Sequence, residues 1–335
     1  MFKFYFKLLL CNISDKTTTD SLKINIYMKK LTYLILTFFS ATAFAQEVTQ
    51  DRVKSVISTL ASDEMKGREI GTPENENAAN YIAKLFKENN LEYCTGDSYL
   101  VPFDYKGKTV YNVCGIKKGK SEKTVGFSGH FDHIGVSKRG GEDTIYNGAD
   151  DDASGITTLV GISDYFKNQK PEFSMVFMAF NGEEKGMLGS TAIAADKNLD
   201  KIYNNLSALF NFEMVATESE FGKNAVFITG DEFSDLDELM NSHSENGLKI
   251  HPDPYASEQL FYRSDNVSFV KKKIIAHSIS TADMSKIKHY HQVNDDISVV
   301  DFENLTQIIN SFGKTLEKLT PKNFNPKYND KVKFN

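Results

Sequence analysis

Short apolar runs alternate with amphipathic segments along most of the chain, and this alternation restricts the fold more than any other feature. The runs have the length of β-strands and occupy residues 124–127, 174–180, 208–212, 225–229 and 273–278. Apolar residues recur at helical spacing in residues 49–60, 79–86, 154–166, 186–195, 234–246 and 301–319. The pattern predicts an α/β fold, a three-layer αβα sandwich whose mixed, mostly parallel sheet carries helices on both faces.

Composition and charge limit both the size of the domain and the class of partner. Of the 335 residues, 40% are hydrophobic, which supplies the material for one large packed core. No repeat or Pro/Gly-rich linker divides residues 46–320, so we expect one domain there, followed by a loosely held polar tail at residues 321–335. The formal net charge of -6 gives no basic surface of the kind that nucleic-acid binding needs.

Residues 28–45 have the order of a secretory signal peptide. Two lysines precede an apolar run of roughly 14 residues, and an A-x-A segment ends at Ala45. The run is short for a bilayer span, so we expect an exported protein, periplasmic or secreted, with no stable membrane anchor and a mature N-terminus at Gln46. Residues 1–27 read as an upstream extension from a start codon placed too early.

Two cysteines remain after such a cleavage, Cys94 and Cys114. An exported protein can pair them, but their spacing alone does not show that they come within bonding distance. Neither lies in a CxxC motif, which argues against a metal site built from cysteine.

Charged residues follow three of the predicted strands at the point where each strand ends. His130 and Asp132 follow the first run, Glu183 and Glu184 follow the second, and Glu213 follows the third. Ligands of open α/β sheets bind in the crevice outside the carboxyl ends of the strands, so we expect these side chains to converge. Three adjacent aspartates, at residues 150–152, enter the next helix and form a fourth contribution.

Each of these motifs has an ordinary structural explanation when it is taken alone. Aspartates before a helix commonly cap its N-terminus, and a glutamate pair is commonly a solvated helix end. Two glutamates soon after an apolar strand, however, would repel each other in a partly buried place unless a cation lay beside them. Histidine together with carboxylates, without thiolates, suits zinc or a similar metal.

Five segments resemble, in the same order, the five motifs of the di-zinc exopeptidases. They are GHFDH, YNGADDDASG, FNGEEKGMLGS, NFEMV and HYHQVND, and the upstream KGREIGT resembles the entry segment of many bacterial members. The family includes bacterial leucyl aminopeptidase and glutamate carboxypeptidase, with glutaminyl cyclase as a relative. The resemblance extends from about residue 55 to residue 319 and implies that residues 46–320 form a zinc exopeptidase domain.

The resemblance also implies a site with two zinc ions. The metal ligands that it implies are His130, Asp151, Glu184, Glu213 and His291. Asp151 would bridge both ions, Glu184 would bind the second, and Glu213 stands where the family most often has an aspartate. His133 and His289 lie close to the implied histidine ligands and compete with them for these roles.

Catalytic roles follow from the same resemblance. Glu183 would be the general base, and Asp132 would orient the ring of His130. Asp150 and Asp152 would be structural. A phenol would help to stabilise the oxyanion, with Tyr290 the first candidate and Tyr262 the second.

The implied activity is that of an aminopeptidase acting on peptide substrates, with the free α-amine bound by the second ion. Arg263, in a segment that resembles the family's specificity pocket, could instead bind a substrate carboxylate and favour a carboxypeptidase acting on acidic residues. Glutaminyl cyclase is a further alternative, although EEKGMLGS is continuous here, as in the peptidases. A binding module without catalysis would be expected to lose the base or the ligands, and both are kept. The residue removed and the oligomeric state stay open.

Overall fold

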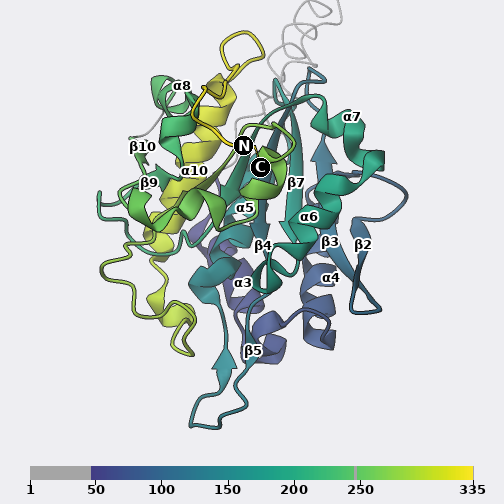
Figure 1. The fold of residues 1–335 in the computed structure, drawn as a ribbon, viewed down its shortest axis with the longest axis vertical. Helices are drawn as coiled ribbons and strands as arrows, with labels where there is room; N and C mark the ends of the chain where they lie inside the picture. Colours follow the sequence, from purple (N-terminus) through teal and green to yellow (C-terminus); the bar gives the residue numbers. More distant parts are fainter. Residues whose placement is uncertain (1–46, 245–246, 335) are drawn as a thin grey trace, which may run out of the picture. The chain divides into compact units, whose positions relative to one another are not determined.

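A computed structural model of the chain describes residues 47–244 and 247–334 (Figure 1). The predicted signal peptide at residues 28–45 and the predicted mature N-terminus at Gln46 lie outside the described residues. Among the helices of the described part, none has both the length and the apolar character that a membrane span requires.

The main sheet of the described chain has nine strands in the order β1-β3-β7-β4-β8-β11-β9-β10, with β2 paired to β3. The strands β7, β4, β8 and β11 are parallel neighbours, and the pairs β3–β7 and β9–β11 are antiparallel. The mixed sheet with a parallel centre is therefore confirmed. The strand bounds are Glu92–Tyr93 (β1), Leu100–Tyr105 (β2), Lys108–Lys117 (β3), Thr124–His130 (β4), Ser174–Phe180 (β7), Leu206–Phe212 (β8), Ala225–Ile228 (β9), Lys249–Pro252 (β10) and Ala276–Ser280 (β11).

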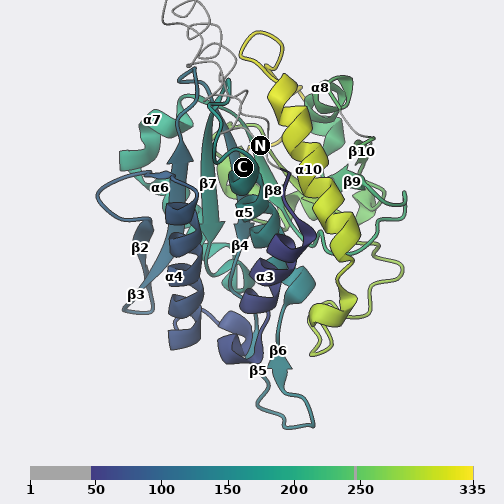
Figure 2. The same cartoon turned by 180° about the vertical axis from the view of Figure 1, so that it is seen from behind.

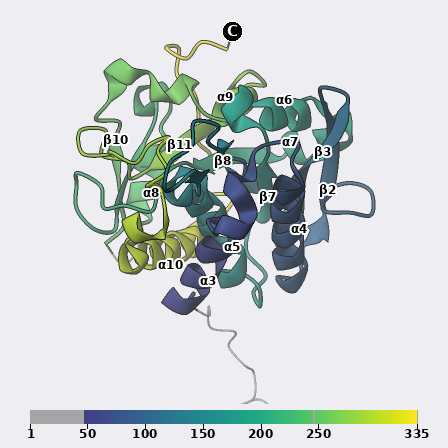
Figure 3. The same ribbon diagram turned by 90° about the horizontal axis from the view of Figure 1, so that it is seen from below.

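Helices cover both faces of this sheet, as the sequence predicts. One face carries α3 (Gln50–Leu60), α4 (Pro73–Glu88), α5 (Gly155–Tyr165) and α10 (Phe302–Lys318), which stand in front of the strands in Figure 2. The other carries α6 (Leu188–Ala195), α7 (Asp200–Tyr203) and α9 (Asn266–Val270), as the view in Figure 3 shows. A further helix, α8 (Leu236–Ser242), packs beside β10.

The central strands are rich in apolar residues because they lie inside the core. Every residue of β4 and β7 is buried, because helices lie on both sides of them. Phe127 of β4 stacks on Phe177 of β7 and Phe210 of β8, with ring centroids 5.3 and 5.9 Å apart. Phe312 of α10 meets Phe210 edge to face at 5.4 Å. This packing fixes the ends of the three strands from which the site is built.

The C-terminal segment differs from the prediction of a loosely held tail, which is wrong. Phe324 and Val332 are buried, and the Tyr328 hydroxyl donates to the carbonyl of Ile274 and accepts from the backbone N–H of Ala276. The tail is therefore packed against β11. Its few large apolar residues outweigh its polar composition.

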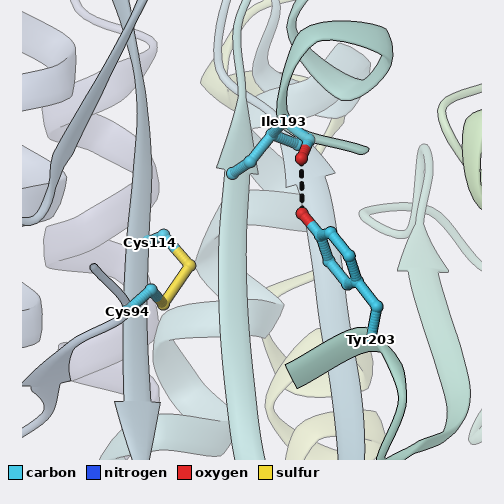
Figure 4. Close-up of a disulfide and its surroundings, with 4 residues drawn as sticks. All are labelled: Cys94, Cys114, Ile193 and Tyr203. Carbon is cyan, nitrogen blue, oxygen red and sulfur yellow. Dashed lines mark hydrogen bonds between the residues drawn. A yellow bond between two sulfur atoms is a disulfide. The ribbon is translucent and has the colours of Figure 1, made fainter. Parts of the chain in front are cut away.

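A disulfide joins Cys94 and Cys114, whose Cα atoms are 5.7 Å apart (Figure 4). It links the segment after β1 to β3 at one side of the sheet. In the same view, the Tyr203 hydroxyl of α7 donates to the carbonyl of Ile193 in α6. The structure thus makes the pairing that the sequence left open.

Candidate metal centre

Three neighbouring parallel strands deliver the candidate ligands to one edge of the sheet. His130 is the last residue of β4, Glu183 and Glu184 follow β7, and Glu213 follows β8. The spatial order β7-β4-β8 places these ends side by side. The turn of residues 149–154 (η2), which leads into α5, adds Asp151. The convergence comes from the topology, since ligands bind at the carboxyl ends of such strands.

The first group of possible metal ligands contains His130, Asp151 and Glu213. His130 Nε2 lies 3.2 Å from Asp151 Oδ1 and 3.4 Å from Glu213 Oε1. His130 is only 1% exposed, and within the described chain its Nε2 has no hydrogen-bond partner. A buried ring nitrogen facing two carboxylates in this way fits a metal ligand.

The second group contains Asp151 again, now with Glu184 and His133, and His291 contacts both carboxylates from beside it. His291 Nε2 lies 3.3 Å from Asp151 Oδ2 and 3.2 Å from Glu184 Oε2. His133 Nδ1 lies 2.8 Å from Glu184 Oε1. Asp151, Glu184 and His133 form a set that could hold an ion. Nitrogen and oxygen atoms spaced about 3.3 Å apart suit tetrahedral zinc, whose ligands lie about 2.0–2.2 Å from the ion.

The side chains of the second group stabilise one another in their charged forms even when no ion is bound. Hydrogen bonds to Asp151 and Glu184 raise the pKa of His291 to about 10. Burial opposes ionisation of Glu184, but contacts with His133 and His291 lower the pKa of Glu184 to about 2. Cations, whether protons or metal ions, are therefore favoured at this place.

Asp132 contacts both the histidine and the glutamate pair. Its backbone carbonyl lies 3.1 Å and its Oδ1 lies 3.6 Å from His130 Nδ1. Its carboxylate accepts the backbone N–H of Glu183 at 3.1 Å and that of Glu184 at 3.3 Å. One buried side chain thus links the end of β4 to the turn after β7.

Asp150 and Asp152 belong to neither ligand group, and their carboxylates hold the backbone. Asp150 accepts from the N–H of Ala216, and its Oδ2 lies 2.9 Å from His289 Nε2. The ring of His289 therefore has a partner in Asp150 and needs no metal ion. The carboxylate of Asp152 accepts three backbone N–H groups, those of His130, Gly155 and Met214.

Two residues that support the site were not identified from the sequence. The carboxylate of Asp295 accepts the N–H groups of Asp150 at 2.8 Å and Asp151 at 3.0 Å. Arg68 is fully buried and donates to the carbonyls of Leu60, Phe131, Asn147 and Gly148. Both lie in the recognised segments HYHQVND and KGREIGT, but only the fold reveals what they contact.

A pocket opens beside the two groups. Asp151, Glu183, Glu213 and His291 line it on one side, and Arg263 and Tyr290 line it elsewhere. The Tyr290 ring stacks on His291 with centroids 3.9 Å apart. Tyr262 does not line this pocket and packs against Phe233 and Phe261, so the structure favours Tyr290 of the two candidate phenols. The other lining residues are Met214, Phe227, Thr229, Leu260, Ser264, Ser278, Ser280, Ala282 and Met284.

Comparison with known proteins shows one family match and several relatives. The sequence model of peptidase family M28 matches residues 112–315. Aminopeptidase Y from Saccharomyces cerevisiae is 26% identical over 214 residues, which make up 58% of this chain and 36% of that protein. Three other curated proteases also match, and the chain spans less than a quarter of the length of each.

Solved structures share the fold at low identity. A zinc aminopeptidase from Bacillus subtilis has a TM-score of 0.62 at 16% identity, covering 83% of this chain and 97% of that chain. A glutaminyl cyclase from Bacteroides thetaiotaomicron has a TM-score of 0.63 at 15% identity, covering 82% of this chain and 100% of that chain. The fold alone therefore does not distinguish a peptidase from a cyclase.

Proposed function

Because this chain belongs to peptidase family M28, we propose that it is a two-zinc exopeptidase that removes single residues from peptide ends as an aminopeptidase. The observation that carries the proposal is the position of Asp151. Its Oδ1 faces His130, and its Oδ2 faces His291, so one carboxylate takes part in two separate ligand groups beside one pocket. A carboxylate in this position can serve two ions at once.

Each ligand group would hold one ion. His130 and Glu213 would bind the first together with Asp151, and Glu184 and His291 would bind the second. Glu213 is one methylene longer than the usual aspartate, but its Oε2 is held by the Ser264 hydroxyl at 2.6 Å while its Oε1 faces His130. When bound, such ions would supply a water of lowered pKa and would polarise the scissile carbonyl.

Glu183 is the residue that we assign as general base. It belongs to neither ligand group, and it lines the pocket beside Asp151 and Glu213. Burial raises the pKa of Glu183 to about 10, against the opposing effect of His130. At this pKa the carboxyl is protonated at neutral pH when no ion is bound, and cations held beside it would lower its pKa. The assignment as base therefore rests on its position, from which the carboxylate would take a proton from water and pass it to the leaving amine.

The aminopeptidase assignment depends on the free α-amine of the substrate, which in its neutral form can bind a zinc ion. Tyr290 lines the pocket next to His291, where its phenol could stabilise the oxyanion. A glutaminyl cyclase would need one zinc only, whereas Asp151 here faces a second set of possible ligands as well as the first. The second group and the continuous turn from Glu183 to Leu188 therefore favour the peptidase.

Arg263 supports a second candidate, a carboxypeptidase acting on acidic residues. Its side chain is exposed, lines the pocket and forms no ion pair with another described residue. A guanidinium in this position can bind a carboxylate through two hydrogen bonds.

Metal analysis combined with rates on a panel of aminoacyl and N-blocked substrates tests the proposal. We expect two zinc ions per chain, cleavage of the unblocked substrates, loss of activity with a chelator and recovery with zinc. One zinc per chain with cyclisation of N-terminal glutamine and no hydrolysis would instead identify a cyclase.

We also propose that the protein is exported, on the evidence of residues 28–45 alone. N-terminal sequencing of the protein from each cell fraction should find a chain that begins at Gln46, or its cyclised form, outside the cytosol. Recovery of Met1 from the cytosol would contradict the proposal.

A further inference from the structure

His133 is a buried histidine to which the proposed mechanism gives no role. It lies in the loop after β4, and its side chain is 0% exposed. Neither ring nitrogen has a hydrogen-bond partner among residues 47–244 and 247–334. Leaving a buried polar group unpaired costs about 1–3 kcal/mol. A buried ring of this kind is therefore expected to bind a partner that is not part of the polypeptide.

The surroundings of Nδ1 indicate what that partner is. Nδ1 lies 2.8 Å from Glu184 Oε1 and 3.8 Å from Asp151 Oδ2. Glu184 Oε1 also lacks a hydrogen-bond partner in the described chain, so these two atoms lie close together without pointing at each other. Atoms arranged in this way can both bind a third atom that lies between them. His130 Nε2 has the same relation to its two carboxylates in the first group.

The ring is held in place by the backbone beside it. A Cβ atom on Gly148 would lie 2.7 Å from Cγ and Cδ2 of His133, so only glycine leaves room for the ring. The Gly148 carbonyl in turn accepts from Arg68 Nη2 at 2.9 Å. On the other side, the ring of His291 crosses that of His133 at 68° with centroids 5.8 Å apart.

We propose that His133 is a further metal ligand, binding through Nδ1 the ion that Asp151, Glu184 and His291 hold. The inference rests on the two-ion site proposed above. Zinc ligands at about 2.0–2.2 Å from the ion lie about 2.9 Å apart when they are at right angles and about 3.3 Å apart in a tetrahedron. The 2.8 Å from His133 to Glu184 fits the first spacing, and the 3.2 and 3.3 Å of His291 fit the second. The 3.8 Å from His133 Nδ1 to Asp151 Oδ2 is wider than both and corresponds to a more obtuse angle at the ion.

The assignment makes the two ions unequal. The ion beside Glu184 has four protein ligands, and the ion beside His130 has three. Zinc sites with more protein ligands are more closed, and open positions are what a substrate needs. On this inference the α-amine would bind the first ion, beside His130, and not the second ion, to which the family resemblance assigns it.

Counting coordinated imidazoles tests the proposal in the unaltered protein. In the full chain loaded with cobalt(II), each ligating imidazole with an N–H on its other nitrogen gives a strongly shifted, exchangeable proton signal. We expect three such signals, from His130, His133 and His291, and two signals in His133→Gln. His289→Gln is the matched control, because His289 is buried and bound to Asp150, and it should keep all three. Two signals in the wild-type protein would overturn the inference.

Zinc affinity gives a second readout that does not depend on activity. In competition with a chelator, His133→Gln should weaken one of the two zinc ions by at least about 10-fold, and His289→Gln should change neither by more than about 3-fold. Weakened affinity together with only two wild-type signals would show that His133 orients Glu184 without binding the ion. That result, with two ions and intact hydrolysis, would sink this inference alone, whereas a chain that binds no zinc would sink the proposed function itself.

Discussion

Glu183 and Glu184 are adjacent, yet their surroundings shift their pKa values in opposite directions. Glu184 meets His133 at 2.8 Å and His291 at 3.2 Å, and these contacts hold its pKa at about 2 against burial. Glu183 forms no ion pair with a histidine of the described chain, and burial, opposed by His130, raises its pKa to about 10. The opposite shifts distinguish a group that stays charged beside a cation from a group that holds a proton when no ion is bound.

Replacement of Glu183 by glutamine should therefore abolish turnover without removing metal. We expect Glu183→Gln to lower kcat by about 10³-fold or more while zinc content stays near that of the wild type, because the residue takes the proton and binds no ion. Glu184→Gln is the matched control and should lose metal. Loss of one metal equivalent in Glu183→Gln would show that the two roles are reversed.

The three aspartates of residues 150–152 should separate in the same way. Asp151→Ala should lose both metal and activity, because both ligand groups contain this carboxylate. Asp152→Ala should keep more metal but lose about 3 kcal/mol or more of unfolding free energy, since three buried N–H groups lose their acceptor. Metal analysis and urea unfolding of both variants check this. If Asp152→Ala proves the more metal-depleted, the register of the triplet is wrong by one residue.

At the scale of elements, the fully buried central strands could be predicted, whereas the edge strands and the interior strand β3, which is exposed at one end, could not. The sequence predicts β7 over its full length because all seven residues are buried. The short or partly exposed strands β1, β2 and β10 give no continuous apolar run. β11 begins at Ala276 and not at the predicted residue 273, because Lys273 has a φ of 64° in the turn that follows α9.

β11 also carries a buried histidine that makes stability depend on pH. His277 Nδ1 lies 2.7 Å from the carbonyl of Thr229 and must donate to it, so Nε2 accepts from the Ser234 hydroxyl at 2.8 Å. Burial lowers the pKa of His277 to about 4 from the ordinary 6.5. The unfolded chain therefore binds more protons between these values, and the stability present above pH 6.5 is lost as the pH falls toward 4.

The expected size of this loss is up to about 3 kcal/mol, at about 1.4 kcal/mol for each pH unit between the two pKa values. Urea unfolding at pH 7.5, 6 and 5 should show the decline in the wild-type protein and a shallower one in His277→Asn. Since other groups also titrate in this range, the comparison of the two slopes is the measurement. Equal slopes would mean that His277 contributes nothing to the acid sensitivity.

At the scale of the whole molecule, the sequence indicates which residues gather but not what supports them. His130, Glu184 and Glu213 follow parallel strands, and the rule for the carboxyl ends of such strands brings them together. Arg68 and Asp295 contact backbone groups 63 and 145 residues away, at Phe131 and Asp150. Only the completed fold sets such distant contacts, so no local pattern could assign them.

The end of the peptide from which the enzyme removes residues also depends on the whole pocket. A zinc-bound α-amine must be neutral to offer its lone pair, and an N-acetyl group removes that lone pair. We expect acetylation of a dipeptide substrate to lower kcat/KM by at least about 100-fold, which corresponds to about 2.7 kcal/mol of lost transition-state binding. Conversion of the same dipeptide to its C-terminal amide should change kcat/KM by less than about 3-fold, because an aminopeptidase does not need the terminal carboxylate.

Arg263 supplies the matched check on that choice, because it is the arginine that lines the pocket. If the enzyme is a carboxypeptidase, the guanidinium holds the terminal carboxylate, so amidation lowers kcat/KM in the wild type and matters little in Arg263→Met. If it is an aminopeptidase, acetylation is harmful in both proteins to the same extent, since the amine binds metal and not Arg263. Indifference to acetylation together with a sensitivity to amidation that disappears in Arg263→Met would therefore reverse the assignment and identify Arg263 as the residue that selects the substrate.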